Sequence, residues 1–118
     1  MKTETNRVGQ TTVIKLLERR LGADKAGEFK AEIGKYVEAG ETKIVLDLAE
    51  LSFMDSSGLG ALVSVLKMIG KRGDLTIAGT QATVQTLFRL TRMDKVFRSF
   101  PTVSEAVQAL TPQDTLKG

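Results

Sequence analysis

The sequence contains no cysteine and no histidine among its 118 residues. Without cysteine, disulfides, thiolate metal sites and cysteine nucleophiles are excluded. Without histidine, the chain lacks the usual general base, the commonest metal ligand and the Ser-His-Asp relay. Carboxylates, lysines and the single tyrosine could still move protons, but they form a small catalytic set. We therefore expect a binding protein that is not an enzyme and has no cofactor or structural metal.

Long apolar runs are also absent from the chain. No stretch approaches about 18 consecutive apolar residues, so we expect no membrane span. The segment from Met1 to Arg7 is polar and no apolar segment follows it, so we expect no signal peptide and a cytoplasmic location. At 118 residues with 42% hydrophobic content, the chain is expected to fold as one domain.

The net charge is +3, because 17 lysines and arginines outnumber 14 aspartates and glutamates. The positive residues are spread along the chain, and the densest groups are Arg19-Arg20, Lys71-Arg72 and the stretch with Arg89, Arg92, Lys95 and Arg98. Only one tyrosine and five phenylalanines are available for stacking on bases, and no nucleic-acid-binding motif is present. We expect a solvated basic surface and no direct contact with nucleic acid.

The hydrophobic pattern changes its period several times along the chain. Extended runs on both sides of Gly9-Gln10 predict an N-terminal hairpin. Strands are also predicted at 43–48, 75–79 and, more weakly, 96–100, and the nearly continuous apolar run at 43–48 indicates a strand covered on both faces. Helical spacing predicts helices at 24–40, from Ser56 or Ser57 to Gly70, around 84–88 and at 103–110, with Asp24 as the N-cap of the first.

Strands that alternate with helices predict an α/β fold. We expect one mixed, mostly parallel sheet of four to five strands that begins with the hairpin and is covered by about four helices. The expected domain spans residues 1–110, and residues 111–118 form a polar C-terminal tail.

The segment from Leu51 to Gly60 connects the predicted central strand to the second helix. Three interpretations of its polar residues remain open at this point. Asp55, Ser56 or Ser57 could simply cap the helix. The glycines could form a phosphate-binding turn, although the Walker lysine and the last glycine of a dinucleotide fingerprint are missing. A serine hydroxyl could also be the target of another enzyme, whereas a serine nucleophile is disfavoured because no histidine can serve as its base.

The segment Asp55-Ser56-Ser57-Gly58-Leu59-Gly60 resembles the Asp-Ser-Ser/Thr-Gly-Leu-Gly signature of STAS-domain anti-sigma-factor antagonists. The similarity covers most of the chain and continues, in order, through residues 26–29, 44–48, 84–97 and 102–106. The motif alone would be ordinary, but its place in this series of segments is specific to the family.

This resemblance implies a single STAS domain that binds an anti-sigma factor with serine kinase activity and thereby frees a sigma factor. In the family, the kinase phosphorylates the first serine after the aspartate, which is Ser56 here, and phosphorylation releases the antagonist. A serine phosphatase then restores it. The residues that would shape the partner-binding surface are Asp55, Ser57, Gly58, Leu59, Gly60 and Asp24. We expect a monomer or a weak dimer.

The sequence departs from the family at three positions. Arg19 and Gly22 replace the glycine and the aspartate of Gly-x-Leu-Asp in the family's partner-binding region, and Asp24 could supply a charge nearby. Arg92 replaces the glycine of Leu-Thr-Gly. The first two departures keep a second function open, that of a STAS scaffold or lipid-transport subunit that is not phosphorylated. A nucleotide-binding STAS module is the weakest alternative, because no Walker-type lysine follows the glycines.

Overall fold

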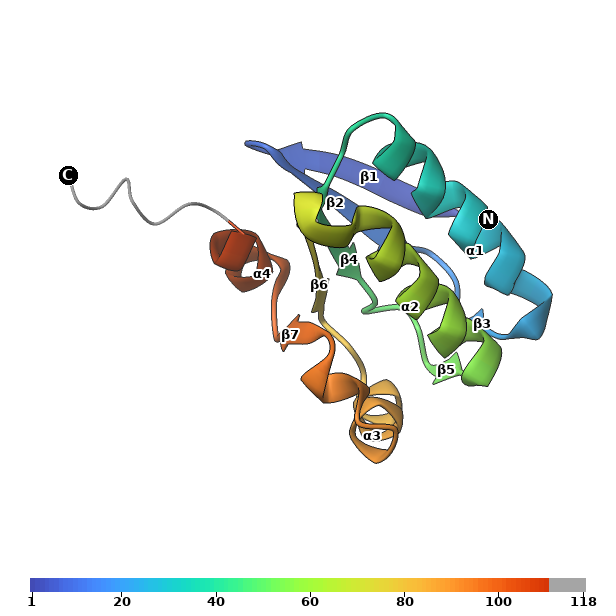
Figure 1. The fold of residues 1–118 in the computed structure, drawn as a ribbon. Helices are drawn as coiled ribbons and strands as arrows, with labels where there is room; N and C mark the ends of the chain where they lie inside the picture. Colours follow the sequence, from blue (N-terminus) through green and yellow to red (C-terminus); the bar gives the residue numbers. More distant parts are fainter. Residues whose placement is uncertain (111–118) are drawn as a thin grey trace.

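The main sheet has five strands in the order β1-β2-β4-β6-β7 in a computed structural model that describes residues 1–110 (Figure 1). The strands are β1 (Thr3–Val8), β2 (Thr11–Leu16), β4 (Lys43–Asp47), β6 (Asp74–Ala78) and β7 (Arg98–Phe100). The first two form an antiparallel hairpin, and every other neighbouring pair is parallel. The predicted mixed sheet with an N-terminal hairpin is therefore confirmed. The expected polar tail at 111–118 lies outside the described residues.

Residues 1–110 contain four α-helices, the number that the sequence predicts. They are α1 (Ala23–Glu38), α2 (Ser56–Ile69), α3 (Ala82–Leu90) and α4 (Val103–Leu110). Figure 1 shows α1 and α2 side by side on one face of the sheet. Helix α4 packs against the opposite face. Among residues 1–110, no helix has both the length and the apolar character needed to cross a membrane.

The central strand β4 is buried on both faces, which confirms the interpretation of its apolar run. Ile44 and Leu46 belong to the large core under α1 and α2, whereas Val45 belongs to the smaller core under α4. All three side chains are fully buried. Side chains of a strand alternate between its faces, so a strand between two helical layers needs apolar residues at consecutive positions.

A second, two-stranded sheet was not predicted from the sequence. It pairs β3 (Arg20–Leu21) with β5 (Phe53–Met54) in parallel. Strands of two residues carry no hydrophobic period, so pattern analysis does not find them. This small sheet joins the chain just before α1 to the chain just before α2, and Figure 1 places both strands beside the first turns of these helices.

The start of α1 differs from the prediction. The sequence indicated Asp24 as the N-cap, but the helix begins at Ala23 and its N-cap is Gly22, which has no side chain to accept a hydrogen bond. Asp24 instead lies in the first turn, exposed to solvent. The reason is that an acceptor for the first turn of α1 comes from a distant part of the chain, as described below.

Candidate functional site

The turn between β5 and α2 carries the polar residues singled out in the sequence. Asp55 has an extended backbone conformation and is the N-cap of α2, so the helix begins at Ser56 as predicted. Ser56 and Ser57 are both exposed. Within residues 1–110, the Ser56 side chain forms no hydrogen bond, so its hydroxyl is presented to solvent at the first position of a helix.

The Asp55 carboxylate holds the starts of two helices at once. Its Oδ1 atom accepts a hydrogen bond from the Gly58 backbone N–H at 3.0 Å, and its Oδ2 atom accepts one from the Ala23 N–H at 3.2 Å. The bond from Gly58 is the main reason why the pKa of Asp55 lies below its ordinary value. The N–H groups of Ala23 and Ser57 and the positive charge of Arg20 lower that pKa further.

Two of the expected partner-binding residues are buried. A Cβ atom on Gly58 would lie 2.2 Å from the backbone oxygen of Leu21, so only glycine allows α2 to pack this closely against β3. The Leu59 side chain is 9% exposed and belongs to the large core. These residues therefore position the turn, and their role in partner binding stays a prediction.

The remaining expected residues stay accessible. Gly60 is exposed on the second turn of α2, and a Cβ atom added there would meet no other atom within 4 Å. Asp24 lies in the same corner as Asp55, since both carboxylates come close to the position that a Gly22 side chain would occupy. The exposed groups that the fold brings together here are the hydroxyls of Ser56 and Ser57, the Gly60 backbone and the Asp24 carboxylate.

Arg20 and Phe53 form a contact at this site that the sequence analysis missed. The guanidinium carbon of Arg20 lies 4.3 Å from the centre of the Phe53 ring, a cation–π geometry. The Phe53 side chain is 41% exposed, although it is large and apolar. Only the pairing of β3 with β5 brings these two residues together, so no local sequence signal could have indicated the contact.

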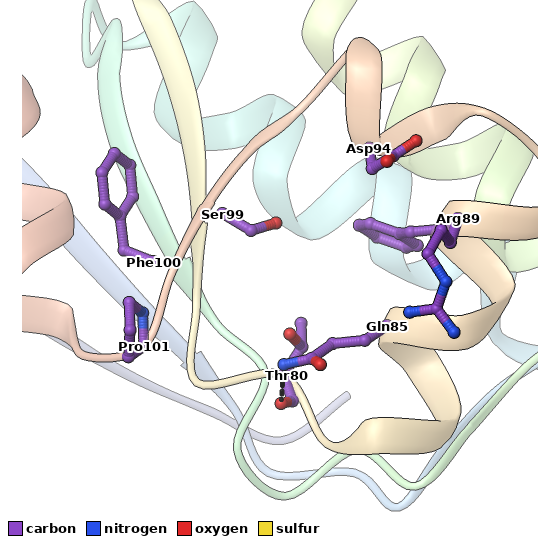
Figure 2. Close-up of a pocket in the computed structure, with 8 residues that line it drawn as sticks. Thr80, Gln85, Arg89, Asp94, Ser99, Phe100 and Pro101 are labelled. Atoms are coloured by element: carbon purple, nitrogen blue, oxygen red, sulfur yellow. Dashed lines mark hydrogen bonds between the residues drawn. The ribbon is translucent and has the colours of Figure 1, made fainter.

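One hollow of the molecule lies away from this turn. It has a volume of about 320 Å³ between α3 and β7, and its lining residues are Thr80, Gln85, Phe88, Arg89, Asp94, Ser99, Phe100 and Pro101 (Figure 2). The Gln85 side chain donates a hydrogen bond to the Thr80 backbone oxygen at 3.1 Å, and both residues line this hollow. None of the residues that the sequence analysis assigned to the site lines this hollow. The described part of the chain also contains no group of three histidine, cysteine or acidic side chains placed to hold a metal ion.

Comparison with known proteins agrees with the geometry of the fold. Residues 3–106 match the STAS domain family. A Thermotoga maritima protein named as a candidate anti-sigma factor antagonist is 29% identical over 98 residues, which cover 81% of this chain and 87% of the relative. An anti-sigma factor antagonist from Mycobacterium paratuberculosis has a crystal structure that matches with a TM-score of 0.84 at 23% identity, over 92% of each chain.

A further solved structure is that of the Bacillus cell-fate determinant SpoIIAA in its phosphorylated form. It matches with a TM-score of 0.69 at 23% identity and covers 93% of this chain and 100% of that one. At this level of identity, the two solved structures bear on the fold alone. The match over residues 3–106 covers most of the sequence, and the chain belongs to the STAS domain family.

Proposed function

We propose that the protein is an anti-sigma-factor antagonist controlled by phosphorylation. Unphosphorylated, it binds an anti-sigma factor that is also a serine kinase and frees a sigma factor; phosphorylation of Ser56 ends the binding. Membership of the STAS family and the names of its relatives support the antagonist role. The observation that carries the switch is the exposed Ser56 hydroxyl, which forms no hydrogen bond within residues 1–110, beside a fixed Asp55 carboxylate.

The local structure supports a modification that leaves the fold intact. Ser56 is the first residue of α2, where backbone N–H groups and the helix dipole favour negative charge. The Gly58 N–H is already bonded to Asp55, so the helix start does not depend on the Ser56 side chain. A phosphate there would point to solvent and add about −1.5 to −2 charges next to the Asp55 carboxylate. Such a group repels and crowds a docked partner without unfolding the domain.

The phosphoryl transfer needs only an acceptor hydroxyl from this chain. A base on the kinase takes the proton from the Ser56 hydroxyl, and the oxygen attacks the γ-phosphorus of ATP. The bond between that phosphorus and the β–γ bridging oxygen breaks, and ADP leaves. A phosphatase reverses the change by hydrolysing the phosphate ester with water. The chain supplies only the hydroxyl, which is consistent with a sequence that has no histidine and no cysteine.

The accessible residues around Ser56 define the proposed docking surface. It comprises the Ser56 and Ser57 hydroxyls, the exposed Gly60 backbone and the Asp24 carboxylate, with Asp55, Gly58 and Leu59 fixing the turn beneath. Replacing Gly60 by arginine adds a bulky side chain to this surface, where a Cβ atom has free space. We expect Gly60→Arg to keep the fold and to weaken partner binding at least tenfold.

The test is to incubate the protein with ATP and each serine-kinase-type anti-sigma factor of the source organism, and to map phosphate by mass spectrometry. We expect one phosphate on Ser56, none on the Ser56→Ala variant, and unchanged modification of the matched Ser57→Ala control. Phosphate on Ser57 would overturn the assignment of the serine. Stable binding without phosphate on either serine would point instead to a STAS scaffold.

A further inference from the structure

We infer that Arg20 binds the phosphate on Ser56 and leaves the Phe53 ring when it does so. The inference rests on the proposed phosphorylation of Ser56 and names the side chain that responds to it. In the unphosphorylated structure, Arg20 lies over the Phe53 ring at 4.3 Å, and both residues are exposed. The guanidinium is thus held near the turn by a weak contact that a stronger partner can replace.

Arg20 belongs to none of the ion pairs formed within residues 1–110, and its charge acts on the Asp55 carboxylate only at longer range. The neighbouring Lys25 differs, since its amino group is bonded to Glu18 at 2.8 Å and would have to break that pair to meet a phosphate. Arg20, on the short strand β3, is therefore a cation that is available to a phosphate at the turn between β5 and α2.

The pairing of β3 with β5 places Arg20 near the turn between β5 and α2. Leu21 and Met54 are paired and point into the core, with exposed fractions of 0% and 6%. Side chains alternate along a strand, so Arg20 and Phe53 point outward. Just beyond the two strands, Gly22 and Asp55 form a second pair of neighbours. That second pair is in contact, since a Gly22 Cβ atom would lie 2.9 Å from the Asp55 Oδ2 atom. Ser56 follows Asp55 directly.

Charge favours the phosphate over the ring. The Arg20 charge already acts on Asp55, where it helps to lower the carboxyl pKa. A phosphate brings a larger charge and three acceptor oxygens, which a guanidinium binds in a bidentate manner. Gly22 strengthens the effect, because no carboxylate on that residue competes for Arg20. Phosphorylation would then add charge to the docking surface. It would also remove the Arg20 guanidinium from the face of the partly exposed Phe53 ring.

The experiment installs phosphoserine at position 56 during translation, so that no kinase is needed. The phosphate pKa is then measured by ³¹P NMR titration in the otherwise unchanged chain and in the variants Arg20→Gln and Arg19→Gln. A nearby guanidinium favours the dianion, so we expect Arg20→Gln to raise the phosphate pKa by about half a unit, roughly threefold in the acid constant. The matched Arg19→Gln control, which removes the same charge from the adjacent residue, should shift it much less.

A second measurement follows the movement of the Arg20 side chain away from the Phe53 ring. Protons of the Arg20 side chain lie over Phe53 and should resonate upfield in the unphosphorylated protein, and Phe53→Leu should abolish that shift. We expect the upfield shift to vanish on phosphorylation. Equal phosphate pKa values in the two glutamine variants, or a ring shift that phosphorylation leaves unchanged, would overturn the inference. Because the phosphate is installed directly, a failure of the kinase to modify Ser56 would refute the proposed switch without affecting this result.

Discussion

Gly22 and Asp55 face each other across the two short strands, and the missing side chain of Gly22 gives the Asp55 carboxylate room to reach α1. The Oδ2 atom of Asp55 accepts a hydrogen bond from the Ala23 N–H at 3.2 Å, one of the backbone donors that the first turn of a helix leaves without an intrahelical partner. The departure from the family pattern at Gly22 thus has a structural counterpart. One carboxylate caps α2 and also serves the helix whose own N-cap is glycine.

This shared carboxylate leads to a prediction for Asp55. Replacing it by alanine removes the acceptor for both helix starts, so both the Gly58 and the Ala23 amides should lose protection against hydrogen exchange. Asparagine retains one oxygen acceptor, and we expect Asp55→Asn to keep the Gly58 amide protected while the Ala23 amide exchanges faster. Measurement by NMR hydrogen exchange separates the two cases. Loss at Gly58 alone in the alanine variant would show that Asp55 does not support α1.

The two glycines of the motif should respond to alanine in opposite directions. A Cβ atom on Gly58 collides with the Leu21 backbone oxygen at 2.2 Å, so Gly58→Ala should destabilise the protein by about 1–3 kcal/mol. Gly60 is helical, exposed and surrounded by free space, so Gly60→Ala should stabilise it by about 0.5–1 kcal/mol. Urea denaturation of the two variants measures the difference. Equal effects would contradict the close packing of α2 on β3.

Acid should destabilise the fold through three carboxylates. Bonds from the Lys2 backbone and the Lys25 side chain lower the pKa of Glu18, the Thr12 hydroxyl lowers the pKa of Glu41, and the Gly58 N–H lowers that of Asp55. Below the ordinary pKa values, the unfolded chain binds more protons than the folded one, so protonation favours unfolding. We expect the free energy of unfolding to be level above about pH 5 and to fall below about pH 4.5.

A matched variant checks the origin of this acid dependence. Glu41→Gln keeps an oxygen that can accept the Thr12 hydroxyl bond, which is 2.7 Å long, but it cannot titrate. Its stability should therefore fall less steeply between pH 4.5 and pH 3 in urea titrations at fixed ionic strength. A slope identical to that of the unchanged protein would exclude Glu41 from the account.

Much of the fold could be predicted from the sequence, because its elements carry their own signals. The Gly9 turn, the apolar run from Ile44 to Leu46 and the capped start at Ser56 each depend on residues that are close together in the chain. The predicted start of α1 was wrong because the Ala23 N–H in its first turn bonds to the carboxylate of Asp55, which lies on another segment of the chain. Long-range contacts of this kind have no local period.

Some features of the candidate site could likewise be predicted from local sequence, whereas others depend on contacts between distant segments. The motif identified the turn and its exposed serines, since Asp55 bonds to the nearby Gly58. The contact between Arg20 and Phe53 depends on the pairing of two-residue strands, which only the folded chain shows. Burial of Gly58 and Leu59 likewise follows from the packing of α2 against Leu21.

Calorimetry measures whether phosphate on Ser56 switches partner binding off. The chain with phosphoserine installed at position 56 and the unmodified chain are each titrated into the serine-kinase anti-sigma factor that modifies Ser56. Repulsion next to Asp55 predicts at least a hundredfold weaker binding of the phosphorylated chain, with identical far-UV circular dichroism for both. Equal affinities of the two forms would contradict the account.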